Sequence, residues 1–120
     1  MAIGRTVTFS LEAADVLAGE GLSAEVMDLR WLSPLDWDAI FGSVRKTGRL
    51  VVVDPAARIC SAASEIAATV GEQCYKVLHG PVRRVTAPHV HTPYSPALEK
   101  GIYPDADKIA AAVRTAAAGE

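Results

Sequence analysis

The stretch that decides the fold is Arg49–Asp54, which reads RLVVVD. Its unbroken Leu-Val-Val-Val run is typical of a strand whose two faces are both covered, as in a parallel sheet. Two further strands are indicated at Ser23–Leu29, where apolar residues partly alternate, and at Val82–Ala87. Met1–Ile3 precedes a turn at Gly4 and leaves room for only a very short first strand.

Helical patterns separate and follow these strands, at residues 6–19, 37–48, 64–78 and 105–119. Asp36 is placed to cap the second helix, and Ser61 or Ser64 to cap the third. Gly71 is expected to kink or divide that third helix. Strands alternating with helices predict one α/β domain over residues 1–120, a three-layer α/β/α sandwich with a mainly parallel sheet.

Pro88–Pro104 interrupts this alternation. It contains four prolines together with His and Tyr residues, and prolines forbid a regular hydrogen-bonded ladder. The segment is therefore expected to be an extended crossing on the surface.

Composition excludes several classes of protein. Half of the 120 residues are hydrophobic and the mean hydropathy is +0.19, which argues against disorder. The formal net charge of −2 offers no basic surface for nucleic acid. No apolar run reaches the roughly 18 residues of a membrane-spanning helix, and no signal peptide is recognisable. Cys60 and Cys74 stand far apart and suggest reduced thiols, so a cytoplasmic protein is expected.

Few residues suggest chemistry. His89 and His91 would point the same way on a strand, which makes them weak candidates for metal ligands. No third ligand is evident in the sequence, so a pair of exposed surface histidines is the better interpretation. Asp54 ends an apolar strand, where functional groups gather in doubly wound sheets. The other acidic and lysine residues of a phosphate-accepting receiver domain are absent. Cys60 is best interpreted as a structural thiol. These residues alone indicate a domain without its own active site.

Aromatic and apolar residues suggest an interaction surface. Those around the LSPLD turn are expected to form a partner-facing or inter-layer surface together with two tyrosines of the Pro-rich segment. An equally weighted alternative is that they cover the domain's own core. The residues concerned are Leu29, Trp31, Leu32, Leu35, Tyr94 and Tyr103.

Five stretches in a fixed order carry a family resemblance. They are LEAADVLAGEGLSAEVMDLRWLSPLDWDAI (11–40), SVRKTGRLVVVD (43–54), SEIAATV (64–70), PVRRVTAP (81–88) and PYSPALEK (93–100). From Leu11 to Val113 the chain resembles the C-terminal domain of the transketolase superfamily. It is most similar to the beta subunit of thiamine-diphosphate-dependent 2-oxo acid dehydrogenases of the pyruvate, branched-chain and acetoin types.

This resemblance implies a mixed sheet of about five strands and a role in assembly. The family's beta subunit pairs with a thiamine-diphosphate-binding alpha subunit, and the cofactor and Mg lie between that subunit and the N-terminal domain of beta. The complete enzyme decarboxylates a 2-oxo acid and acylates lipoyl-lysine, and the C-terminal domain docks the subunit-binding domain of the lipoyl acyltransferase. The chain is thus expected to be a homo-oligomer that binds no cofactor and is inactive alone. The alternative is a free-standing, dimeric interaction module without enzyme activity.

Three departures from the family pattern stand out. Pro55 replaces a usual Glu, and Arg58–Ala63 replaces a Gly-rich loop, so contacts made there in the family are in doubt. His89 and His91 stand where the family often has Asp and Pro. The short Met1–Ile3 leads us to expect a truncated first strand in a chain that is a fragment of a longer subunit.

Overall fold

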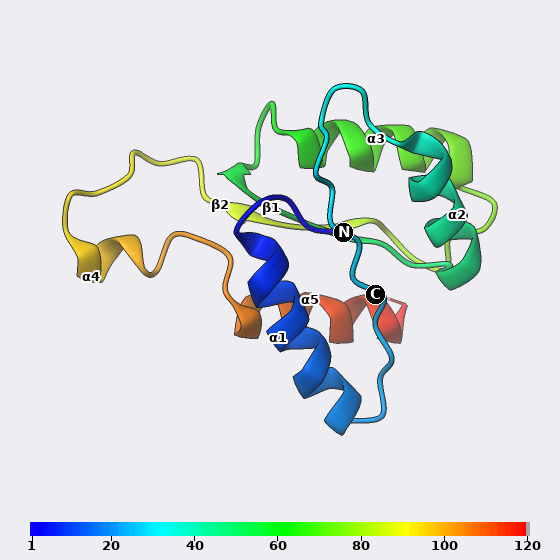
Figure 1. Ribbon diagram of the computed structural model, residues 1–120, viewed down its shortest axis with the longest axis horizontal. Helices are drawn as coiled ribbons and strands as arrows, with labels where there is room; N and C mark the ends of the chain where they lie inside the picture. The colour runs from blue at the N-terminus through cyan, green and yellow to red at the C-terminus, as the bar shows by residue number, and fades with distance from the viewer. Residues whose placement is uncertain (120) are drawn as a thin grey trace.

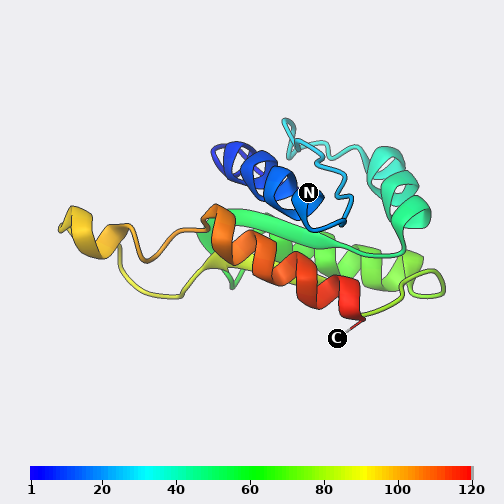
Figure 2. The same cartoon turned by 90° about the horizontal axis from the view of Figure 1, so that it is seen from below.

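The computed structural model describes residues 1–119 and shows helices packed on both faces of a small parallel sheet (Figures 1 and 2). The elements in order are α1 (Thr6–Gly19), α2 (Trp37–Thr47), β1 (Val51–Ala57), α3 (Ala62–Cys74), β2 (Arg83–Ala87), α4 (Pro96–Glu99) and α5 (Ala106–Ala118). Among these described residues, no helix is long and apolar enough to cross a membrane.

The sheet is centred on β1, the strand expected from the valine run. β1 pairs in parallel with β2, with Val51 opposite Arg83 and Val53 opposite Val85. The ladder is irregular between Asp54 and Ala57, where Pro55 interrupts it. Proline has no N–H to donate, so a break in pairing at this position follows from the sequence.

Ala2 pairs with β1 on the edge opposite to β2. It is fully buried and makes isolated parallel bridges both to Val53 of β1 and to Asp28. Its N–H donates to the carbonyl of Met27 at 2.9 Å, and its own carbonyl accepts from the N–H of Leu29 at 3.0 Å. The N–H of Ile3 donates to the carbonyl of Val53 at 3.1 Å. Met1–Ile3 is therefore an internal strand in effect, between the segment 27–29 and β1.

Side chains alternate between two cores, one on each face of β1. Val52 joins the core formed with α2 and α3, which contains Ile40, Val44, Ile66 and Val70. Val53 joins the second core with Ala2, and this core is completed by Ala13 and Leu17 of α1 and by Ile109 and Ala110 of α5. This division produces the three layers that the sequence predicted.

Helix caps agree with the sequence. The Asp36 carboxylate accepts from the N–H of Ala39, and the Asp105 carboxylate from the N–H of Lys108. Of the two serines considered for α3, Ser61 is the N-cap and accepts from the N–H of Ser64. The backbone N–H of Lys108, followed by the Lys108 side chain, lowers the pKa of Asp105. These caps satisfy N–H groups that the first helical turn leaves unpaired.

Several expected elements differ in the structure. The predicted strand Ser23–Leu29 is reduced to the single bridge at Asp28, and the sheet of about five strands is not confirmed. α3 runs through Gly71 without a break and ends at Cys74, four residues earlier than expected. The Pro-rich segment contains the short helix α4, for which Pro96 provides a suitable first residue.

The first prediction concerns Gly48, the C-cap of α2. Its φ of +65° is left-handed, and a Cβ placed on it would lie 2.6 Å from the His79 imidazole. Gly48→Ala is expected to lower the free energy of unfolding by about 1–3 kcal/mol, because both the backbone conformation and the contact are unfavourable.

Gly71→Ala is the matched control, since Gly71 lies within α3 and its Cβ would meet nothing within 4 Å. Alanine should stabilise that position by about 0.5–1 kcal/mol. Urea denaturation of both variants measures the difference. Equal free energies of unfolding would contradict the role assigned to Gly48.

The second prediction concerns how the free energy of unfolding of the 120-residue chain, prepared with a free amino group at Met1, depends on pH. Burial lowers the pKa of this group from 8.0 to about 6, and the Glu25 carboxylate opposes the shift in part. The unfolded chain, in which the amino group keeps its usual pKa, binds more protons between these values. The free energy of unfolding should therefore fall as the pH drops from 8 to 6, by on the order of 2 kcal/mol.

Urea denaturation at the two pH values measures this change. Chemical acetylation of the Met1 nitrogen removes the charge and should abolish most of the difference. The same pH dependence in the acetylated chain would show that another group is responsible.

Candidate functional site

The loops at the carboxyl edge of the sheet carry most of the exposed large apolar side chains. Residues 30–36 follow the segment bridged to Ala2, residues 58–61 follow β1, and residues 88–104 follow β2. Because these strands are parallel, their carboxyl ends lie at one edge. The side chains exposed there are Trp31, Leu32, Ile59, Val90, Tyr94 and Leu98. This edge is the candidate functional surface.

The segment 88–104 projects from the body of the domain as an arm (Figures 1 and 2). Tyr94 is fully exposed, Leu98 is 65% exposed, and α4 buries none of its residues. The base of the arm is held by the Lys108 ammonium, which donates to the carbonyls of Gly101 at 3.0 Å and Tyr103 at 2.9 Å. The arm thus has a fixed base and an apolar surface that its own domain does not cover.

The predicted interface residues do not form one surface. Trp31 is 76% exposed and Leu32 is about half exposed, whereas Leu35 is half-buried and packs against the α2–α3 core. Leu29 is itself part of that core.

Tyr94 and Tyr103 lie on the arm, and Tyr103 is half-buried, with its hydroxyl 3.4 Å from that of Thr92. The arm lies apart from the loop 30–36 in both views (Figures 1 and 2). The reason is the strand order, in which Met1–Ile3 and β1 separate the two loops. The residues expected at an interface thus lie in two separate patches of one edge and in the core, and their contact with a partner stays a prediction.

Asp54 organises the loop that replaces the family's Gly-rich turn. Its carboxylate is 3% exposed and accepts from the N–H of Ala56 at 2.9 Å and from the N–H of Ala63 at 3.1 Å. The second donor lies in the first turn of α3, where a negative charge is favourable. Asp54 therefore holds the loop against α3, a structural role that its position at the end of a strand did not reveal.

The same loop is fixed from the side of β2. The Arg84 guanidinium donates to the hydroxyl of Ser64 at 2.8 Å, and that hydroxyl donates to the carbonyl of Arg58 at 2.7 Å. Cys60 has a φ of +55° and is exposed. Left-handed backbone is thus retained at one residue of the loop although the glycines are absent.

His89 and His91 lie exposed at the start of the arm. Within residues 1–119, no group of three His, Cys, Asp or Glu side chains is placed to hold a metal ion. The two histidines accordingly have no third ligand in the described part of the chain.

Comparison with known proteins agrees with the sequence resemblance. Residues 1–109 match the family described as "Transketolase, C-terminal domain". The chain is 49% identical over 108 residues to the acetoin:2,6-dichlorophenolindophenol oxidoreductase subunit beta of Bacillus subtilis, covering 90% of this chain and 32% of that one. It is 48% identical over 104 residues to the pyruvate dehydrogenase E1 component subunit beta of Leifsonia xyli, covering 86% and 30%.

A solved structure shares the fold. It is described as a split gene transketolase, inactive beta4 tetramer, and it superposes with a TM-score of 0.87 at 30% identity, covering 98% of this chain and 38% of that one. The chain spans about a third of the length of the curated relatives named above. With the match over residues 1–109, these findings show that the chain belongs to the transketolase C-terminal domain family and is related to beta subunits of pyruvate and acetoin-type 2-oxo acid dehydrogenases.

Proposed function

We propose that this domain is the non-catalytic assembly part of the beta subunit of a thiamine-diphosphate-dependent 2-oxo acid dehydrogenase. The observation that carries the proposal is the arm 88–104, which presents Val90, Tyr94 and Leu98 to solvent from a fixed base. Exposed aromatic and aliphatic anchors on a defined support are typical of protein interfaces. Because the relatives are beta subunits, such an interface would join this domain to other subunits of the enzyme.

In this proposal the two patches contact different surfaces of the assembly. The arm packs against a neighbouring beta subunit or the alpha subunit, and Trp31 and Leu32 contact the N-terminal domain of beta. The name of the split gene transketolase relative describes an assembly of four beta chains without activity. That description supports a domain family in which association and catalysis reside in different parts of the enzyme.

The cofactors belong to the other parts of the enzyme in this proposal. The described residues offer no cluster of His, Cys, Asp or Glu suited to a metal ion, so their donor set does not fit the Mg that accompanies thiamine diphosphate. No step of the reaction is therefore assigned to this domain. The complete enzyme would decarboxylate a 2-oxo acid and acylate lipoyl-lysine, and this domain would also dock the subunit-binding domain of the acyltransferase. Two free cysteines support a cytoplasmic location.

The third prediction tests assembly in a chimera. Residues 1–120 replace the matching C-terminal third of the Bacillus subtilis beta subunit, and the chimera is co-expressed with that enzyme's alpha subunit. Light scattering after size exclusion should show the chimera bound to alpha. Combining Tyr94→Ala with Leu98→Ala should weaken association by about tenfold or more, because hot-spot residues dominate interface energies.

Controls separate assembly from folding. The same double substitution should leave the melting temperature of the 120-residue chain unchanged, since both side chains are exposed. Val16→Ala removes another half-exposed apolar side chain, on α1 away from the arm, and should not affect assembly. A chimera that folds but does not bind alpha, or a double variant that assembles like the parent, would refute the proposal.

A further inference from the structure

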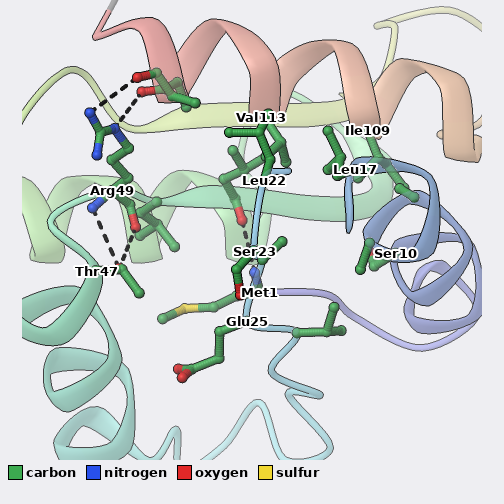
Figure 3. Close-up of a pocket in the computed structure, with 18 of the residues that line it drawn as sticks. Met1, Ser10, Leu17, Leu22, Ser23, Glu25, Thr47, Arg49, Ile109 and Val113 are labelled. Carbon is green, nitrogen blue, oxygen red and sulfur yellow. Dashed lines mark hydrogen bonds between the residues drawn. The ribbon is translucent and has the colours of Figure 1, made fainter. Parts of the chain in front are cut away.

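The outer edge of β2 is open in the described part of the chain. β2 pairs with β1 on one side, and the bridges of Ala2 lie beyond β1, on the far side of the sheet. Helices α3 and α5 pack on the two faces of β2. α5 is held there by the Arg49 guanidinium, which donates to the carbonyls of Ala116 and Ala117 (Figure 3). The helices thus cover the faces of β2 and leave its outer edge free.

The backbone groups of Arg84 and Thr86 point away from β1. The N–H of Arg83 donates to the carbonyl of Leu50 at 3.0 Å, and in a parallel ladder every second residue bonds to the same neighbouring strand. Arg83 and Val85 therefore face β1, whereas the N–H and carbonyl groups of Arg84 and Thr86 face outward. Among residues 1–119, no loop or helix backbone group bonds to them. β2 thus offers unused donors and acceptors to another strand.

This edge is complementary to a second copy of itself in one register. Antiparallel pairing centred on Val85 places Arg84 opposite Thr86 of the other copy, and such a pair exchanges both of its hydrogen bonds. Pairing centred on Arg84 would place two arginines directly opposite each other, and like charges there are unfavourable. Pairing centred on Thr86 would place Arg84 opposite Pro88, which has no N–H. Hydrogen bonding and charge therefore select the register centred on Val85.

The side chains beside this edge leave room for the second copy. The Arg84 guanidinium, which could hold another strand away, donates instead to the Ser64 hydroxyl of its own α3 at 2.8 Å. Ala67, Ala68 and Gly71 line a depression between α3 and β2. Edge-to-edge pairing of β2 would bring the α3 helices of both copies side by side on one face, because the two-fold axis is perpendicular to the sheet. Their small side chains permit that approach.

We propose that β2 pairs with β2 of a second copy of this chain, antiparallel and centred on Val85, so that the two sheets form one continuous sheet. Val85, which packs against the α1–α5 core, would contact Val85 of the other copy on the face opposite to α3. The contact uses none of the exposed apolar side chains of the arm. It therefore goes beyond the assembly role proposed for the arm.

Two substitutions of Thr86 in the 120-residue chain test this pairing. Thr86→Pro removes an outward N–H but no bond to β1, and proline is tolerated on edge strands. Thr86→Val keeps the N–H and the branched side chain and is the matched control. Sedimentation equilibrium over a concentration series should show a dimer for the parent and for Thr86→Val. Thr86→Pro should raise the dissociation constant by about tenfold or more, because each copy loses a donor.

A disulfide tests the register independently. Residues opposite each other in a non-hydrogen-bonded antiparallel pair have Cα atoms about 4.5 Å apart, a separation that a disulfide can span. With Cys60 replaced by Ser, Val85→Cys should form a covalent dimer on oxidation with copper phenanthroline and oxygen. Thr86→Cys should not, because Thr86 lies opposite Arg84 in this register.

Each outcome decides the proposal. A dimer that Thr86→Pro weakens and Val85→Cys cross-links supports it. A chain that is monomeric at every concentration overturns it, and so does a dimer that a folded Thr86→Pro variant leaves equally tight. Circular dichroism shows whether that variant folds. Where it does not fold, the disulfides decide: absence of the Val85→Cys cross-link, or equal cross-linking through Thr86→Cys, overturns the proposal.

Discussion

The structure depends on the burial of the extended segment Met1–Ile3 inside the sheet. Through Ala2 this segment bridges residues 27–29 and β1, so that both are held in one sheet. It also positions α1, because the buried hydroxyl of Thr6 donates to the carbonyls of Ile3 and Val53. The first helix is thereby anchored directly to β1 as well as to the strand that precedes it.

Other contacts close the layers around this strand. The Arg114 guanidinium forms a bidentate pair with Glu20, which lowers the pKa of that carboxyl and joins the end of α1 to α5. With both faces of the sheet covered by helices, the loops at its carboxyl edge carry most of the large apolar side chains that stay exposed. The apolar side chains of the arm and of Trp31 lie there.

Local sequence patterns were enough to predict most of the helices and the strand β1. α1 has the predicted bounds, Asp36 and Asp105 are caps, and β1 occupies the valine run, because each depends on nearby residues. The predicted strand Ser23–Leu29 does not form, because a strand depends on its neighbours in the sheet, and among residues 1–119 its one bridge joins Asp28 to Ala2. The separation of Trp31 from Tyr94 and the role of Asp54 likewise follow from strand order and loop path, which no local pattern encodes.

Amide hydrogen exchange of the 120-residue chain, followed residue by residue by NMR, tests the central claim most directly. If Met1–Ile3 is an internal strand between residues 27–29 and β1, the amides of Ile3, Leu29 and Val53 should exchange slowly, near the rate set by global unfolding. The amides of α4 should exchange much faster, because α4 buries none of its residues. Exchange at Ile3 and Leu29 as fast as that of the α4 amides would contradict this account.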